Sequence, residues 1–271
     1  MFFSHALSAL LLASSQYACN SAAHIVAREP QEAKLPAVTI NKFDYIPDNG
    51  PLNWFKVIPD SQLCKSGKNQ SPILLDSTTA QVPAGTLSFE AKKQRGVLEN
   101  KGSAIEVVEV EGAIKYQGTT YKLVNFHFHT PSEHRINKEY YPIEVHFVTQ
   151  TPAKKTLVFG IPIQLSNSEE NDLIKTALAK VSSIKPGEAT RTAELNFSEI
   201  TAYLKNTKLY SYGGSLTTPP CSEGLSWFVG TKPVYAKVGT YNQLKAAVKY
   251  NSRIIQDTPG STNVIEQACA A

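Results

Sequence analysis

The chain has 271 residues, of which 42% are hydrophobic and 18% charged, and its formal net charge is +4. This composition is typical of a globular protein, and the length suits one large domain or two small ones. Lysine and arginine form no cluster along the chain, so the sequence gives little support for nucleic-acid binding. We find no internal repeat and no low-complexity tract.

The N-terminus has the pattern of a targeting segment. A short apolar run at residues 6–13 is followed by small residues, and Ser21 and Ala23 suit cleavage after Ala23. This pattern predicts a secretory signal peptide over residues 1–23, although the usual early Lys or Arg is missing; a buried N-terminal helix is the alternative. No later apolar run reaches the ~20 residues that span a bilayer. We therefore expect a secreted protein, extracellular or periplasmic, with no membrane span and a loose arm at residues 24–38.

The middle of the chain is dominated by short stretches in which apolar and polar residues alternate. Each of these stretches predicts a β-strand: residues 104–110, 121–129, 142–150, 156–165 and 225–236. Residues 168–184 have helical periodicity, with Ser168 as the expected N-cap. A second helix is expected to begin at Thr240, where Gln243 completes a capping box. Many strands, few helices and no obvious break predict one domain.

Histidines gather in two of the predicted strands. Three of the six lie within the ten residues NFHFHTPSEH, 125–134, and His146 follows in PIEVHF. Because side chains alternate between the two faces of a strand, His127 and His129 point the same way. If the strands at 121–129 and 142–150 pair, His146 completes a cluster of three imidazoles. Three histidines with one open position are typical of a catalytic zinc site.

Polar neighbours support a metal site over a strand face that merely happens to be rich in histidine. A histidine ligand needs its second ring nitrogen held by another group. Asn125 lies two residues from His127, and Glu144 lies two residues from His146, on the matching strand faces. A competing interpretation remains, because His127, His129 and Glu133 also resemble the cupin motif H-x-H-x-x-x-E. In a cupin, Glu133 would itself bind iron, manganese or nickel.

A second motif separates these interpretations. YSYGGSLTTPPCSEGLSW, residues 210–227, resembles the signature loop of the α-carbonic anhydrases and has no cupin counterpart that we recognise. Four other groups of residues match that family in the same order: NGPLNW (49–54), GKNQSPI (67–73), FHFHTPSEH with EVHFV, and NSRIIQ (251–256). The resemblance covers about residues 40–258. We therefore place the domain at residues 39–258 and a C-terminal tail at 259–271.

The resemblance implies both a fold and an activity. The fold is mainly β (α+β), a single domain around a large twisted, mostly antiparallel central sheet with a few surface helices. The activity is that of a lyase, carbonate dehydratase: reversible hydration of CO2 to bicarbonate and a proton, by attack of zinc-bound hydroxide on CO2. Some members of the family have lost zinc ligands and serve as non-catalytic binding domains. The full set of ligands here favours a working enzyme.

The resemblance also implies roles for single residues. His127, His129 and His146 match the zinc ligands, Thr217 matches the hydroxyl that orients the hydroxide, and Glu133 matches the carboxylate that accepts from Thr217. Asn125, Glu144 and His134 match groups behind the ligands, although the family more often has Gln at the position of Asn125. The matches to the substrate pocket are Val148, Val158, Leu216, Thr218, Leu225 and Trp227. Tyr45 matches the tyrosine that holds water in the cleft.

One expected residue is missing. In fast members of the family a histidine in the segment matching residues 99–107 passes the proton to buffer, and Ser103 occupies its position here. A serine hydroxyl cannot store a proton near neutral pH, whereas a histidine can. We therefore expect a slower turnover that rises with buffer, with Glu106, Tyr45 or His24 as candidate substitutes.

Cysteines and sequons complete the expectations. Secreted members of the family carry a disulfide at the positions of Cys64 and Cys221. Cys19 would leave with the signal peptide, and Cys269 would be an odd thiol that could cross-link a homodimer. Two sequons, at Asn69 and Asn196, are candidates for glycosylation. Asn196 could instead cap a helix together with Glu199.

Overall fold

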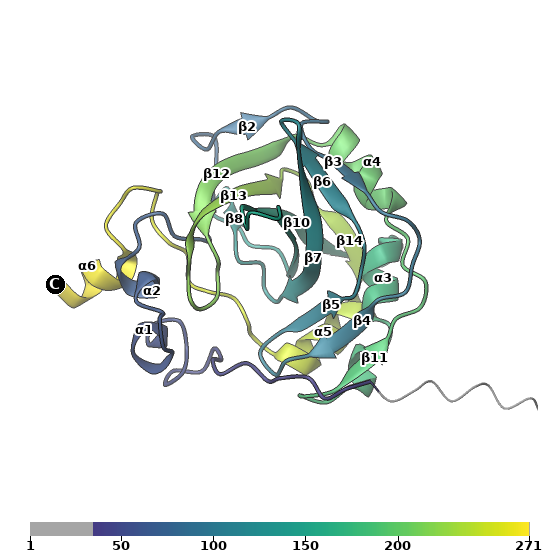
Figure 1. The fold of residues 1–271 in the computed structure, drawn as a ribbon, viewed down its shortest axis with the longest axis horizontal. Helices are drawn as coiled ribbons and strands as arrows, with labels where there is room; N and C mark the ends of the chain where they lie inside the picture. Colours follow the sequence, from purple (N-terminus) through teal and green to yellow (C-terminus); the bar gives the residue numbers. More distant parts are fainter. Residues whose placement is uncertain (1–34, 271) are drawn as a thin grey trace, which may run out of the picture. The chain divides into compact units, whose positions relative to one another are not determined.

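A twelve-stranded mixed sheet forms the body of the protein (Figure 1). The computed structural model describes residues 35–270, so the predicted signal peptide and most of the predicted arm lie outside the described residues. The strands of the sheet are β2 (Gln81–Val82), β3 (Ser88–Glu90), β4 (Val97–Asn100), β5 (Ile105–Val108), β6 (Ala113–Tyr116), β7 (Thr119–His129), β9 (Ile143–Gln150), β10 (Thr156–Ser166), β11 (Ala189–Arg191), β12 (Leu209–Ser215), β13 (Glu223–Gly230) and β14 (Val234–Lys237). A separate parallel pair is formed by β1 (Leu74–Leu75) and β8 (Arg135–Ile136).

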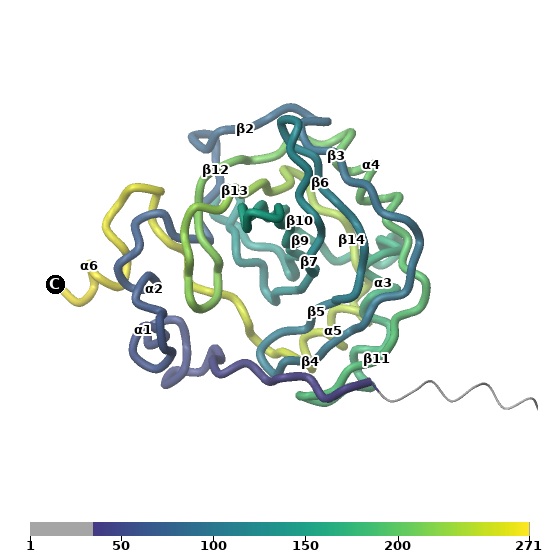
Figure 2. Tube along the Cα trace, viewed as in Figure 1, coloured from purple at the N-terminus to yellow at the C-terminus, as the bar shows by residue number. Residues whose placement is uncertain are grey.

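Strand order across the sheet is β11-β4-β5-β7-β9-β10-β13-β12-β2, with β6 on β7, β3 on β6 and β14 on β10. All of these pairs are antiparallel except β10 with β13 and β10 with β14. The long strands β7, β9 and β10 lie side by side in the middle (Figure 2). The predicted fold class, a large mostly antiparallel sheet with few helices, is therefore confirmed.

Short helices cover the sheet. They are α1 (Trp54–Val57), α2 (Leu63–Ser66), α3 (Asp172–Leu178), α4 (Ser198–Asn206), α5 (Val238–Val248), α6 (Val264–Ala270) and the 3-10 turn η1 (Val181–Ser183). Apolar residues of α3, α4 and α5 pack in one core cluster with Phe126, Phe128 and Phe147. That side of β7 is fully buried, so alternation sends the histidines of β7 to the opposite face. None of the described helices is long and apolar enough to cross a membrane.

The strand predicted at residues 225–236 is two strands. Residues 226–229 of β13 pair with 157–160 of β10, and after a short break β14 pairs with residues 163–166 of the same strand. Pro233 lies in the break and has no N–H to donate to a ladder, which suits an interruption of pairing. The chain therefore leaves β10 over residues 231–233 and returns to it.

Both predicted helix starts were wrong by a few residues. Asn171, and not Ser168, caps α3 by accepting a hydrogen bond from Ile174 N at 3.2 Å. The preceding residue, Glu170, accepts from Lys237 N at 3.1 Å and so ties this segment to the start of α5. Helix α5 begins at Val238, two residues before the predicted start at Thr240. A local side-chain cap thus marks the start of α3, and the hydrogen bond between Glu170 and Lys237 joins the segments that precede the two helices.

The two ends of the described chain are attached to the body. Val38 N donates to Gly187 O at 2.9 Å, and Asn41 N donates to Lys101 O at 3.0 Å. At the other end, the segment expected to be a tail contains α6. The Asn263 side chain just before α6 donates to Cys64 O at 3.3 Å and to Gly67 O at 3.1 Å. These bonds place α6 beside α2.

Candidate metal centre

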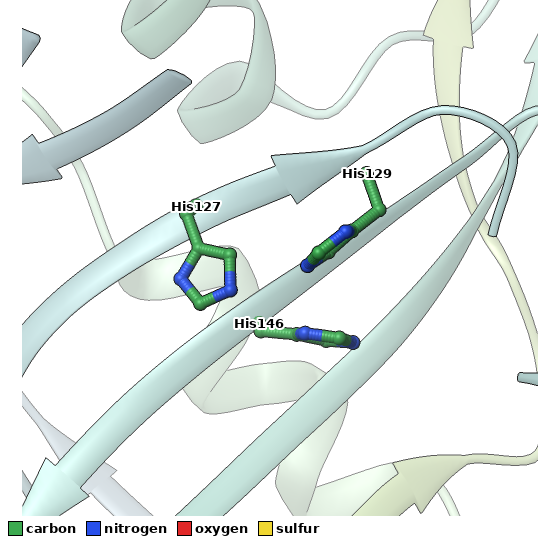
Figure 3. Close-up of side chains that lie close together, drawn as sticks. All are labelled: His127, His129 and His146. Carbon is green, nitrogen blue, oxygen red and sulfur yellow. The ribbon is translucent and has the colours of Figure 1, made fainter. Parts of the chain in front are cut away.

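The three predicted ligand histidines converge on one point. His127 and His129 lie on β7, and His146 lies directly opposite His127 on β9. Their ring centroids are 5.1 Å (127 to 129), 5.3 Å (127 to 146) and 4.5 Å (129 to 146) apart. One nitrogen from each ring lies within 4.8 Å of the other two. Figure 3 shows the three rings facing one another from two neighbouring strands.

In each of the three rings one nitrogen is hydrogen-bonded to a neighbouring group, which leaves the other nitrogen free to bind a metal ion. His127 Nδ1 lies 3.1 Å from Asn125 Oδ1, and His129 Nδ1 lies 2.8 Å from the backbone oxygen of Asn251. His146 Nε2 lies 2.8 Å from Glu144 Oε1. In a neutral imidazole the nitrogen that donates carries the proton and the other carries a lone pair. The lone pairs therefore reside on Nε2 of His127, Nε2 of His129 and Nδ1 of His146.

This donor set fits a divalent metal ion. His129 Nε2 is buried and has no hydrogen-bond partner among residues 35–270, which is costly unless something binds there. Burial and then the neighbouring histidines lower the pKa of His127 well below its usual value, and burial lowers the pKa of His129. Both rings are consequently neutral near pH 7, as metal ligands must be. Three nitrogen donors with an open fourth position suit zinc.

Glu144 organises the buried side of the centre. Its Oε1 accepts from His146 and, at 2.7 Å, from His134 Nδ1, while its Oε2 accepts from the backbone N–H groups of Glu133 and His134, both at 2.9 Å. Burial alone would raise the pKa of Glu144, but the electrostatic attraction and hydrogen bonds of the neighbouring His134 and His146 rings lower that pKa well below its usual value. Tyr212 Oη lies 2.8 Å from His134 Nε2 and 2.8 Å from Ser71 Oγ, which continues the network.

Gly160 makes room for Glu144, and sequence reasoning missed it. The residue lies on β10, directly opposite His146. A Cβ added to Gly160 would lie 2.9 Å from Glu144 Oε1 and 3.4 Å from His146 Cδ2. A glycine inside a long buried strand is the signal that could have found it, because glycine there often marks a close approach.

Glu133 points its second oxygen at the centre. Its Oε1 accepts from Arg253 N at 2.8 Å. Its Oε2 lies 3.5 Å from His129 Nε2 and 3.9 Å from His146 Nδ1, and it has no hydrogen-bond partner among the described residues. Thr217 is buried in the loop after β12, but residues 35–270 show no hydrogen bond between its hydroxyl and Glu133. That hydrogen bond stays a prediction.

The predicted disulfide between Cys64 and Cys221 is formed. It joins α2 to the end of the loop that carries Thr217. Cys269 is a free, exposed cysteine of α6.

A buried arginine lies beside this disulfide. Arg253 Nη2 donates to Cys64 O at 3.0 Å, and Nη1 donates to Gln70 Oε1 at 2.9 Å and to Ser71 O at 2.8 Å. Burial lowers the pKa of Arg253 to about 10, so it stays charged at neutral pH. The sequence suggested no role for four residues of the family motifs whose hydrogen bonds the structure shows: Arg253, Gln70, Ser71 and Asn251.

An apolar wall adjoins the histidines. Of the six predicted pocket residues, five belong to one hydrophobic cluster: Val148, Val158, Leu216, Leu225 and Trp227. Val158 on β10 lies opposite both Val148 on β9 and Trp227 on β13. The Trp227 ring centroid is 4.9 Å from the ring of His146. Thr218 is half-buried in the adjoining loop, outside this cluster.

Ser103 and Tyr45 lie to one side of the centre. Ser103 is buried, and its hydroxyl accepts from Asn41 Nδ2 at 2.9 Å. Both residues line a cavity of about 430 Å³ together with Lys249 and Tyr250. Burial, and then the charge of Glu133, raise the pKa of Tyr45 well above its usual value. Tyr45 therefore keeps its proton near neutral pH.

Comparisons with known proteins agree with this geometry. The family model for eukaryotic-type carbonic anhydrase matches residues 49–259. A carbonic anhydrase of Pectobacterium atrosepticum is 33% identical over 215 residues, covering 78% of this chain and 85% of that protein. A solved fungal α-carbonic anhydrase from Aspergillus oryzae superposes with a TM-score of 0.81 at 39% identity, covering 84% of this chain and 99% of that one. An α-carbonic anhydrase from Thermovibrio ammonificans, solved with the inhibitor sulfanilamide, gives a TM-score of 0.69 at 31% identity, with coverage of 79% and 95%.

Proposed function

Since this chain belongs to the eukaryotic-type (α) carbonic anhydrase family and is a carbonic anhydrase, we propose that it hydrates CO2 at a zinc ion held by His127, His129 and His146. The observation that carries the proposal is the convergence of three ring nitrogens whose partner nitrogens are all hydrogen-bonded elsewhere. Family membership removes the cupin alternative. The intact histidine set argues against a binding domain that has lost its metal.

The protein's part in metal binding is to hold and polarise the ligands. When bound, zinc lowers the pKa of a coordinated water so that a nucleophile exists near neutral pH, and carbonic anhydrase is itself the standard case of this effect. Asn125, Asn251 and Glu144 fix the orientation of one ring each. The carboxylate of Glu144 also raises the basicity of His146 as a ligand.

The apolar wall suits the substrate. CO2 has no net dipole and gains little from hydrogen bonds, so a site for it should be lined by apolar side chains. Val148 and Val158 lie beside the histidines on β9 and β10, and Trp227 packs against His146. These residues would hold the carbon atom next to the nucleophile.

Glu133 and Thr217 would orient the reaction. The free Oε2 of Glu133 is an acceptor with no donor of its own among the described residues. If the Thr217 hydroxyl donates to that oxygen, its own lone pair must accept a hydrogen bond from the nucleophile. The nucleophile's proton is then fixed, and its lone pair is aimed at CO2. Thr218, in the same loop, would contact bicarbonate.

We infer secretion from the disulfide as well as from the predicted signal peptide. Disulfides persist in oxidising compartments, and Cys64 and Cys221 form one here. We therefore place the protein outside the cytosol. In a glycosylating host, Asn196 is the better acceptor, because its Oδ1 accepts from Ser198 N at 3.1 Å and its Nδ2 is not used there. Asn69 instead donates its Nδ2 to Glu223 at 3.5 Å.

Cys269 would allow a covalent homodimer. It is exposed and unpaired near the end of α6. A dimer band that disappears on a reducing gel is the expected result, and its absence under non-reducing conditions would dismiss this arrangement.

Metal analysis with an activity assay tests the function. The purified protein should contain one zinc per chain and hydrate CO2. His146→Ala should lose zinc and nearly all activity, because a three-ligand site without one ligand binds zinc weakly. Glu133→Gln should keep zinc and lose rate. Full zinc and full rate in His146→Ala would show that the centre is elsewhere, whereas loss of zinc in Glu133→Gln would make Glu133 a metal ligand.

A further inference from the structure

Two glutamates continue the histidine row across the sheet. Glu106 on β5 lies directly opposite His127, and Glu99 on β4 lies directly opposite Glu106. Residues that face each other across strands share one face of the sheet. Adjacent strands are about 4.8 Å apart, so Glu99 lies roughly 10 Å from His127. The carboxylates are on the side of the histidines opposite to β10 and β13, which carry Val158 and Trp227.

The two glutamates have a defined set of charged neighbours. Lys101 Nζ donates to Glu106 Oε1 at 2.9 Å, and the side chains of Lys101 and Glu106 are 29% and 12% exposed. Glu99 is half-buried and faces Glu106, Lys101 and Glu109. Glu109 is paired with Arg191 of the edge strand β11 at 2.6 Å. Burial, and then the negative charge of Glu106, raise the pKa of Glu99 above its usual value, against the opposing charge of Lys101.

Hydration creates a proton that has to leave. Each turnover converts CO2 and water into bicarbonate and one proton. Of the four histidines among residues 35–270, three are the ligands, and His134 uses both ring nitrogens in hydrogen bonds to Glu144 and Tyr212. Tyr45 keeps its proton, and the Ser103 hydroxyl is buried against Asn41. Glu106 and Glu99 are the ionisable side chains in line with His127 that lead toward the sheet edge.

We propose that Glu99 is the proton exit of this enzyme: its carboxylate takes up the proton released by hydration and passes it to buffer. This inference rests on the proposed function and adds to it a proton-transfer residue. Only a proton moves, and the Glu99 carboxylate is regenerated when buffer accepts it. A carboxyl group that shares its site with another carboxylate holds a proton closer to neutral pH than an isolated glutamate does.

Kinetics of Glu99→Gln test the proposal. In dilute buffer its kcat for CO2 hydration should fall by roughly 100-fold, because a positioned proton-transfer group is lost. Its kcat/KM, which reports CO2 conversion, should stay at the wild-type value. Concentrated imidazole buffer should restore kcat, and Ser103→His should restore it in the Glu99→Gln background. Glu90→Gln is the matched control, since Glu90 is an exposed carboxylate paired with Lys115 at 2.8 Å on β3.

Infrared spectroscopy gives a reading that does not depend on turnover. The wild-type protein, with or without zinc, should show a protonated-carboxyl band that titrates at a higher pH than the bulk carboxyl groups and is missing in Glu99→Gln. Circular dichroism and zinc content establish that the variant is folded and loaded. A Glu99→Gln enzyme with wild-type kcat in dilute buffer overturns the proposal while leaving the proposed function intact. If the wild-type protein does not hydrate CO2, both this proposal and the proposed function are overturned.

Discussion

Gly160 shows how one missing side chain makes room for the carboxylate that holds His146, a proposed metal ligand. The Glu144 carboxylate reaches along β9 to His146, and the residue of β10 that pairs with His146 is Gly160. Any Cβ at 2.9 Å from a carboxylate oxygen is closer than ordinary contact allows. Because the backbone of a central strand cannot shift freely, the carboxylate would have to move.

Gly160→Ala should therefore weaken zinc binding without destroying the fold. Loss of a hydrogen-bond partner behind a ligand typically costs roughly 10–100-fold in metal affinity. Competition with a chromophoric chelator measures this affinity. Gly213→Ala on β12 is the control, because a Cβ at Gly213 meets nothing within 4 Å. Equal zinc affinity of the two variants would show that Gly160 is not needed for the position of Glu144.

The ligand histidines also predict how stability depends on pH. The pKa of His129 is lowered in the folded protein from its ordinary 6.5, chiefly by burial. Between that lowered pKa and pH 6.5, the unfolded chain binds more protons than the folded protein does. The free energy of unfolding therefore rises with pH in this window and falls as the pH drops below 6.5. The slope is at most about 1.4 kcal/mol per pH unit for each such histidine.

Urea unfolding of the zinc-free protein at pH 7.5 and 5.5 checks this expectation. The free energy of unfolding should be lower at pH 5.5, and His129→Gln should show a smaller difference because one titrating group is gone. A wild-type protein with equal stability at both pH values would contradict the lowered pKa.

At the scale of elements, the disulfide links two segments that carry no regular pairing with each other. Cys64 lies on α2 and Cys221 ends the loop that carries Thr217, and the two cysteines are 157 positions apart in the sequence. Within the loop, Leu216 N donates to Ser222 O and Cys221 N donates to Thr218 O, both at 2.9 Å. Outside it, Gln70 Nε2 donates to Cys221 O at 3.1 Å. The disulfide adds a covalent link to the hydrogen bond that ties this loop to the body of the protein.

Replacing both Cys64 and Cys221 with serine should lower the melting temperature and kcat/KM together. The chain-entropy relation gives at most about 5 kcal/mol for a closed loop of this length, and measured values are usually smaller. Calorimetry measures the melting temperature, and a CO2 hydration assay measures kcat/KM. Cys269→Ser is the control, because Cys269 is exposed and unpaired, and it should leave both unchanged. An unchanged kcat/KM in the double variant would mean that the loop is held in place without the disulfide.

For the whole molecule, we expect the sheet that carries the three histidines to form without metal. The ligands come from β7 and β9, which pair over most of their length and bury Phe126 and Phe147 in the main core. A centre built on paired strands with such a core does not depend on metal for folding, in contrast to a zinc finger. Zinc then adds stability by mass action alone.

Zinc-free protein should accordingly keep its β-sheet circular dichroism spectrum at 25 °C and melt at a lower temperature. Added zinc at 1,000 times its dissociation constant should stabilise the fold by about 4 kcal/mol. A thermal melt as a function of free zinc measures both points. An unfolded spectrum after zinc removal would contradict a preformed centre.

The sequence by itself determined the features that depend on local alternation. His127 and His129 are two residues apart, as are His127 and Asn125, and His146 and Glu144, so the period of a strand places each pair on one face whatever the rest of the chain does. The family motifs then gave the expected pairing of the two strands. The fold class, the ligand cluster and the disulfide pair followed from these patterns.

Only the tertiary structure decided what depends on distant neighbours. His129 is held by the backbone oxygen of Asn251, 122 residues away, and a backbone acceptor leaves no mark in a side-chain pattern. Gly160 matters because of the carboxylate on the next strand, and α3 is capped by Asn171 in a segment that Glu170 ties to Lys237, 67 residues away. The strand register aligns Glu99, Glu106 and His127 in one row. Such choices are made by contacts between segments, which local sequence does not encode.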